Sequence, residues 1–132
     1  MIRPSSLLRR ALLADAVFSG IAAVLLTADA GALAPFLELP ETLLRETGLF
    51  LIAYTALVGW LSSRSSVPKV LVMMVIAGNA AWTVGSIVLL LSGAVAPNAL
   101  GEAFVVAQAI ATGVFAELQY MGLRRSAGEA IA

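Results

Sequence analysis

The chain has 132 residues, of which 61% are hydrophobic and only 12% are charged, and its formal net charge is zero. Soluble domains carry about 25% charged residues, so a soluble fold of this size would have too little polar surface to cover the apolar side chains. The absence of cysteine and histidine excludes disulfides, thiol nucleophiles, His–Cys zinc sites and histidine-based triads. We therefore expect one membrane domain over residues 1–132, with the lipid bilayer as its surroundings and with no metal, no cofactor and no bound nucleic acid.

Four apolar stretches are long enough to cross a hydrocarbon core of about 30 Å, which takes about 20 helical residues. In chain order they are residues 11–28, 42–61, 70–91 and 103–123. The first has an arginine-rich start, as cleavable signal peptides do, but its apolar run is longer than a typical signal core, so we expect it to be retained. These stretches predict an all-α fold, a bundle of four antiparallel transmembrane helices.

The connections between the stretches contain residues that interrupt or cap helices. Pro35 and Pro40 interrupt the segment at 29–41, which we expect to be a periplasmic loop with about one helical turn at the membrane surface. Ser66 and Asn98 stand where they could cap the third and fourth helices.

Basic residues are concentrated on one predicted side of the membrane. Seven of the eight lie near the chain ends or in the turn at 62–69: Arg3, Arg9, Arg10, Arg64, Lys69, Arg124 and Arg125. Only Arg45 falls on the other side. Because cytoplasmic loops carry the excess of Lys and Arg, this bias predicts that both termini are cytoplasmic. The location that we expect is the bacterial inner membrane, crossed several times.

The first and fourth stretches each contain a single acid, Asp15 and Glu117. Asp15 lies about 7 Å along its helix from Arg10, and Glu117 about 10 Å from Arg124, so antiparallel helices would place both acids at a similar depth. We expect an inter-helix ion-pair cluster, with Asp15 paired to Arg124 or Arg125 and Glu117 paired to Arg9 or Arg10. One alternative is a proton-binding site made by two neighbouring acids. Another leaves both acids uncoupled, facing water near the interface.

Uncharged polar side chains recur inside the apolar stretches. They are Ser19 and Tyr54 in the first two, Asn79, Trp82, Thr83 and Ser86 in the third, and Gln108, Thr112 and Gln119 in the fourth. Because an amide that faces lipid has no partner, we expect them to face the bundle interior and to hydrogen-bond between helices. The alternative is a small polar pocket bounded by Asn79, Trp82 and Gln108, with Asp15 beside it.

Four segments carry a resemblance to a known group: "ADAVFSG", "LPETLLRETGLFLIAYTALVGWL", "GNAAWTVGSIVLLLSG" and "GEAFVVAQAIATGVFAELQYMGLRR". Together, over nearly the whole chain, they resemble small bacterial four-helix integral membrane proteins of unknown function. That resemblance implies the fold and no activity. The stretch "AAWTVGSIVLLLSG" is also similar to the third helix of small multidrug-resistance transporters, but the long first loop, Glu117 and the arginines near Asp15 depart from their pattern.

These observations predict a non-enzymatic integral membrane protein, an accessory or partner-binding subunit whose partner is a second copy or another membrane protein. The alternative is a small proton-coupled transporter that uses Asp15 and Glu117. An enzyme acting on lipid is the weakest hypothesis, because two acids without histidine, cysteine, a metal-ligand cluster or a phosphate-binding glycine loop make a poor catalytic set.

Overall fold

The computed structural model describes the backbone of residues 1–131 and the side chains of residues 1–126. The helices are α1 (Ser6–Ala28), α2 (Ala30–Leu37), α3 (Glu41–Ser63), α4 (Lys69–Ser92) and α5 (Ala99–Ile131). Four of them are long and apolar enough to cross a membrane: α1, α3, α4 and the Ala99–Ser126 part of α5. Each predicted stretch lies within one of these four helices. The prediction of an all-α fold with four candidate membrane spans is therefore confirmed, and it indicates a membrane protein.

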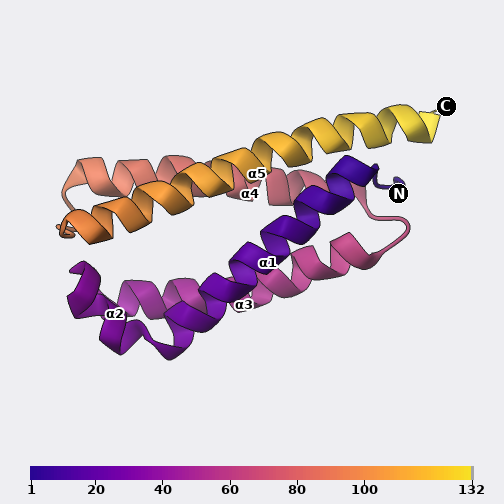
Figure 1. Ribbon diagram of the computed structural model, residues 1–132. Helices are drawn as coiled ribbons and strands as arrows, with labels where there is room; N and C mark the ends of the chain where they lie inside the picture. Colours follow the sequence, from indigo (N-terminus) through magenta and orange to yellow (C-terminus); the bar gives the residue numbers. More distant parts are fainter. Residues whose placement is uncertain (132) are drawn as a thin grey trace.

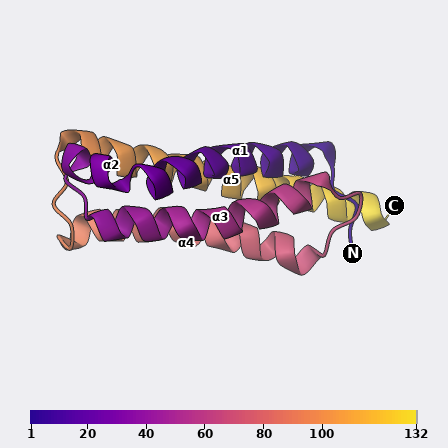
Figure 2. The same ribbon diagram turned by 90° about the horizontal axis from the view of Figure 1, so that it is seen from below.

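The four long helices form two pairs. α1 lies along α3, and α4 lies along α5, while α1 and α5 join the two pairs (Figure 1). In the view turned by 90°, α1 and α5 lie on one side of the bundle and α3 and α4 on the other (Figure 2). Along the described backbone α3 and α4 stay apart for most of their length. The bundle is therefore closed on three sides and looser between α3 and α4.

The end of the bundle where Figure 1 marks both chain termini is closed by contacts between α1 and α5. The backbone N–H of Ser5 donates to Ser126 Oγ (2.7 Å), and Ser5 Oγ donates to the carbonyl oxygen of Gly122 (2.8 Å). A Cβ atom at Gly122 would lie 2.6 Å from the Cα atom of Leu8. The two helix backbones come this close because residue 122 has no side chain.

The opposite end is closed by α2 and by Asn98. Asn98 Oδ1 accepts a hydrogen bond from the N–H of Gly101 (2.8 Å), which confirms Asn98 as the cap of the last helix. Asn98 Nδ2 donates to the carbonyl oxygen of Phe36 (2.9 Å), and the Asn98 N–H donates to that of Leu37 (3.3 Å). One residue thus caps α5 and ties it to the C-terminal end of α2.

Two expectations about the connections are wrong. The segment at 29–41 contains an eight-residue helix rather than about one turn, and Pro35 lies inside it. Ala30 and Leu37, at the two ends of this helix, are buried in an apolar cluster that holds the segment against the bundle, although Pro35 has no backbone N–H to donate. Ser66 does not cap α4, because the residue that precedes the helix is Pro68 and no side chain caps it.

Buried apolar side chains gather in a cluster near each end of the bundle. The first includes Leu8, Leu12, Val58, Leu61, Val67, Val72, Val75 and Leu123, and the second includes Leu26, Ala30, Leu37, Leu39, Leu44 and Val105. The buried polar residues Asp15, Ser19, Asn79 and Gln119 lie on the helices between these two clusters. The candidate site is therefore in the middle of the bundle.

We predict that Gly122→Ala destabilises the bundle by about 1–3 kcal/mol, because the new methyl group would force the backbones of α1 and α5 apart. Gly59→Ala is the matched control, because a Cβ there meets nothing within 4 Å, and we expect it to be neutral or stabilising by about 0.5–1 kcal/mol. Thermal unfolding in detergent micelles measures both. Equal stability of the two variants would contradict the close approach.

Candidate functional site

The buried carboxylate of Asp15, on α1, is at the centre of the polar interior. Its side chain is 0% exposed. It accepts hydrogen bonds from neutral donors on all four long helices: Ser19 Oγ (3.0 Å), Tyr54 OH (2.7 Å), Asn79 Nδ2 (2.9 Å) and Gln119 Nε2 (2.8 Å). Oδ1 accepts one of these hydrogen bonds and Oδ2 accepts the other three, so both oxygens have partners within the bundle.

Two of the donors also bind each other. Asn79 Nδ2 donates to Gln119 Oε1 at 3.0 Å, so Asp15, Asn79 and Gln119 form a closed triangle of hydrogen bonds between α1, α4 and α5. Asn79 is 4% exposed and Gln119 is 0% exposed. Buried polar groups in an apolar medium are costly unless they are paired, and here they pair with one another.

The predicted ion pairs of Asp15 with Arg124 or Arg125 are wrong. Among the side chains that the structure describes, no ion pair involves Asp15. Arg124 lies over the ring of Tyr120, 5.9 Å from its centre, and both arginines are exposed. The register of α1 against α5 is the reason, because it places Gln119 beside Asp15 and leaves the arginines more than a turn further along α5.

The predicted pairing of Glu117 with Arg9 or Arg10 is wrong as well. Glu117 lies on the exposed outer face of α5, while Gln119, two residues or about 200° further around the helix, faces inward. Arg9 donates instead to the carbonyl oxygen of Ser62 on α3 (2.8 Å), and Arg10 is exposed. Glu117 is thus separate from Asp15, although the sequence predicts that the two acids belong to one cluster.

The remaining candidates make a second polar group between α4 and α5. Trp82 Nε1 donates to Gln108 Oε1 (2.7 Å), and Gln108 Nε2 donates to Ser86 Oγ (3.0 Å). The hydroxyl oxygens of Thr83 and Thr112 lie 2.8 Å apart. The two polar stripes of the sequence therefore face each other across this helix pair, as expected of inward-facing residues.

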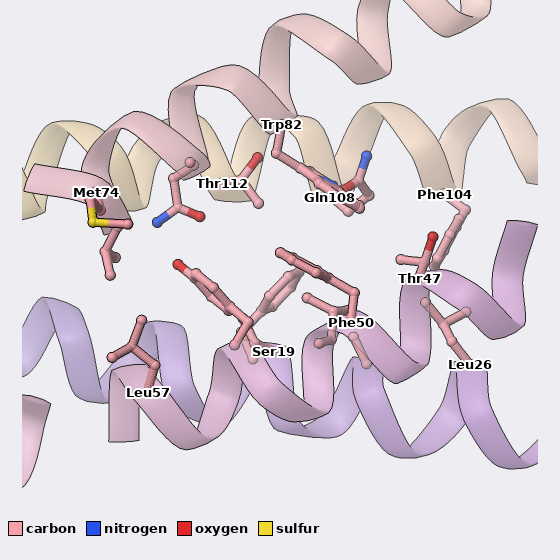
Figure 3. A pocket seen from close by; sticks show the side chains of 17 residues that line it. Ser19, Leu26, Thr47, Phe50, Leu57, Met74, Trp82, Phe104, Gln108 and Thr112 are labelled. Atoms are coloured by element: carbon pink, nitrogen blue, oxygen red, sulfur yellow. The ribbon is translucent and has the colours of Figure 1, made fainter. Parts of the chain in front are cut away.

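A cavity of about 300 Å³ lies between the two helix pairs. Figure 3 shows its labelled side chains on two facing walls, with Ser19, Leu26, Thr47, Phe50 and Leu57 on α1 and α3, and Met74, Trp82, Phe104, Gln108 and Thr112 on α4 and α5. One part of the wall consists of Ser19, Tyr54 and Asn79, which also donate to Asp15. Asp15 itself does not line the cavity, and so it lies one layer behind that wall.

The rest of the cavity wall is largely aromatic and apolar. The rings of Phe50 and Trp82 stack across the gap between α3 and α4, with centroids 6.0 Å apart and planes at 4°, and Phe50 also stacks on Tyr54 at 6.2 Å. Phe50 is 56% exposed and Met74 is 60% exposed, although both line the cavity. The cavity therefore opens to the outer surface of the bundle between α3 and α4.

Small residues on α4 keep this side of the bundle open. A second cavity of about 390 Å³ adjoins the first, shares Gly78, Trp82 and Gln108 with it, and also includes Gly85. A Cβ atom at Gly78 or Gly85 would meet nothing within 4 Å. These glycines do not serve close helix contact, in contrast to Gly122.

The predicted polar pocket did not include three members of the Asp15 network: Ser19, Tyr54 and Gln119. Ser19 lies one helical turn from Asp15, and the other two also carried a usable signal. Tyr54 is a phenol in the middle of an apolar stretch, and Gln119 continues the inward stripe of Gln108 and Thr112 at a spacing of seven. Residue 117 falls outside that stripe, so the same periodicity indicated that Glu117 faces outward.

No family model, curated protein or solved structure matches this chain. The resemblance to small four-helix membrane proteins stays a prediction, and the function has to be argued from the site.

We predict that Asp15→Ala destabilises the bundle by at least about 3 kcal/mol, because it removes the shared acceptor of four donors and leaves buried amides unpaired. Glu117→Ala is the matched control and should change stability by less than about 0.5 kcal/mol, because Glu117 is exposed on the outer face. Both are measured by unfolding in detergent. A loss in Glu117→Ala as large as in Asp15→Ala would contradict the described arrangement.

Proposed function

We propose that this chain is a non-enzymatic integral membrane protein that binds a small apolar molecule in the cavity between the α1/α3 and α4/α5 pairs. The four long helices are antiparallel transmembrane helices, both termini are cytoplasmic, and the membrane is the bacterial inner membrane. The cavity and its opening between α3 and α4 carry this proposal. We interpret the predicted accessory role as binding of this small molecule. That the chain also binds a partner subunit, either a second copy or another membrane protein, stays a prediction.

The outer surface supports a position in lipid. Large apolar side chains are exposed along all four helices, including Leu13, Val17, Ile21, Leu49, Ile52, Val70, Met73, Val84, Ile87, Val106 and Ile110. On α4 only Val72, Val75 and Asn79 are buried. So much exposed apolar surface is compatible with hydrocarbon and not with water.

The dimensions and lining of the cavity support a small apolar ligand. Its volume of about 300 Å³ lies at the lower end of the range of about 300–1,000 Å³ that ligand pockets occupy. The stacked rings of Phe50 and Trp82 offer flat apolar surface, and Gln108 and Asn79 supply polar groups that orient a ligand. The opening between α3 and α4 would admit a molecule dissolved in the bilayer.

The hydrogen bonds around the cavity support a binding role rather than catalysis. The oxygens of Asp15 are occupied by four donors, and its side chain lies behind the cavity wall. Ser19 and Tyr54 donate their hydroxyl protons to that carboxylate. These groups are held in a structural network, and a general base or a nucleophile has to reach the bound molecule.

The topology predicts the labelling of introduced cysteines, which is unambiguous because the chain has none of its own. In intact cells, an impermeant thiol reagent should label Ala96→Cys, in the turn between α4 and α5, and should leave Ser65→Cys, in the turn between α3 and α4, at background until the cells are opened. Both residues are exposed. Labelling of Ser65→Cys from outside would reverse the proposed orientation.

Ligand binding predicts saturable quenching of Trp82 fluorescence by a brominated apolar probe, 1-bromo-4-tert-butylbenzene, in a Trp60→Phe background that leaves Trp82 as the only tryptophan. Gly78→Leu should abolish the saturable part, because Gly78 lines the cavity and a Cβ atom there meets nothing within 4 Å, so the leucine would occupy space that the ligand needs. Gly59→Leu is the matched control, since Gly59 is equally free of neighbours and does not line the cavity. Quenching that rises without saturation would contradict the proposal.

Proton-coupled transport is the second proposal. Asp15 alone would carry the proton, because Glu117 is exposed on the outer face of α5. This proposal is favoured by the absence of an ion pair on Asp15 among the described side chains and by its position behind the polar wall of the cavity. Liposomes containing the protein should then dissipate an imposed pH gradient faster than liposomes without it. Asp15→Asn should lose this effect and Glu117→Gln should keep it. A gradient that decays at the same rate with and without protein would exclude this proposal.

A further inference from the structure

The turn between α3 and α4 carries positive charge without a neighbouring acid in the sequence. Residues 47–101 contain no aspartate or glutamate, and their only basic residues are Arg64 and Lys69. Arg64 is the first residue after α3, and Lys69 is the first residue of α4. Both are exposed, and neither forms an ion pair among the described side chains. The turn is therefore complementary to an anionic group.

This turn lies at one end of the opening between α3 and α4. Figure 1 shows it at the end of the bundle where both termini are marked. Along α3, Arg64 continues the line of Phe50 and Leu57 at a spacing of seven residues, which returns to nearly the same face of a helix. Phe50 and Leu57 both line the cavity. Arg64 is thus at the end of a stripe that leads into the cavity.

The side chain of Arg64 is directed back along α3. Its guanidinium lies over the ring of Trp60, 5.5 Å from the ring centre. Trp60 is about one helical turn from Leu57, where the cavity begins. The candidate span on α3 ends at Ser63, and tryptophan and arginine at the end of a span are typical of the membrane surface. The positive charge therefore lies at the depth of the membrane surface, close to the cavity.

The cavity extends from there over the depth of an acyl chain. Its lining residues on α3 run from Leu57 to Thr47, ten residues or about 15 Å. That length is about half of a hydrocarbon core of about 30 Å, and so the depth of the acyl chains of one leaflet. The volume of about 300 Å³ is small among ligand pockets and leaves room for one chain rather than for the two of a phospholipid.

We propose that the cavity binds the chain of a long-chain fatty acid, with its carboxylate at Arg64. This inference rests on the proposed function, since it names the chemical class of the ligand. Arginine binds a carboxylate through two parallel hydrogen bonds, and Lys69 adds positive charge at the same turn. The chain lies against Leu57 and Phe50, and its end reaches Trp82. The fatty acid enters sideways from the bilayer, between α3 and α4.

The first test compares a fatty acid with its neutral ester. Saturable quenching of Trp82 is measured with 11,12-dibromostearic acid and with its methyl ester in the Trp60→Phe protein, a substitution that keeps an aromatic ring beneath Arg64. The measurement uses a nonionic detergent at alkaline pH, with partition into protein-free micelles determined separately. The acid should bind about fivefold more tightly, because one basic residue at a membrane surface contributes about that factor.

The position of the bromine atoms along the chain tests the direction of the ligand. The ring of Trp82 stacks on Phe50, which lies ten residues or about 15 Å from Trp60 along α3. With the carboxylate at Arg64, 11,12-dibromostearate should therefore quench Trp82 more at saturation than 6,7-dibromostearate. A fatty acid with its carboxylate at the opposite end, near Arg45, would give the reverse order, because Arg45 is only five residues from Phe50.

A pair of arginine variants tests the source of the preference. Arg64→Gln should bring the affinities for the acid and the ester to within about twofold. Arg124→Gln is the matched control and should keep the full preference. Arg124 also lies over an aromatic ring, that of Tyr120, but it is on α5, which does not border the opening between α3 and α4. Both arginines are exposed, so both variants should fold.

The outcomes distinguish this inference from the proposed function. Equal affinities of the acid and the ester, or the reverse order of the two bromine positions, would overturn the fatty-acid site and leave the apolar cavity intact. A preference that survives in Arg64→Gln would overturn the role assigned to Arg64. Unbrominated phosphatidylglycerol that competes better than oleate would assign the opening to a phospholipid instead. No saturable quenching by any probe would overturn both proposals, and a dimer in gel filtration would then assign the opening to a second copy.

Discussion

A single carboxylate inside an apolar bundle is the constraint on which the rest of the structure depends. Lipid offers Asp15 no hydrogen bonds, so its hydrogen-bond donors have to come from within the protein. The donors come from α1, α3, α4 and α5. Each helix therefore brings one particular residue to the depth of Asp15, and this requirement limits the rotations that each helix can adopt about its axis.

Glycine has two opposite roles around this centre. Gly122 lets the backbone of α5 lie against Leu8 of α1, so the helix that carries Asp15 is held tightly. A Cβ atom at Gly78 or Gly85, on α4, would meet nothing within 4 Å, and both glycines leave space beside Trp82. The close contacts concentrate around α1, and the open space lies between α3 and α4. The cavity thus forms where α3 and α4 are not in close contact.

The network and the cavity share residues, which links structure to function. Tyr54 and Asn79 satisfy Asp15 on one side and form part of the cavity wall on the other. A ligand that approaches this wall meets side chains already held in position by the carboxylate, so little ordering is required on binding. The same hydrogen bonds hold Asp15 behind the cavity wall.

Sequence alone determined the features that depend on residue count and composition. Apolar length located the four candidate spans, and turn chemistry identified Asn98 as a helix cap. The depth of Asp15 in the membrane could also be compared with that of residue 117 from the sequence. At 1.5 Å per residue along antiparallel helices, the two positions lie at a similar depth. Inward-facing stripes of polar residues followed from the cost of an amide in lipid.

The partners of Asp15 were decided only by the tertiary structure. Glu117 and Gln119 lie at almost the same depth but about 200° apart on α5, so only one of them can face Asp15, and the packing of α5 against both α1 and α4 selects Gln119. The arginines were the expected partners of Asp15 because the sequence shows the charge of each residue and its position along the helix, but not the direction in which its side chain points. In three dimensions, neutral donors from four helices satisfy the carboxylate first, because the rotation of each helix is set by all of its neighbours together.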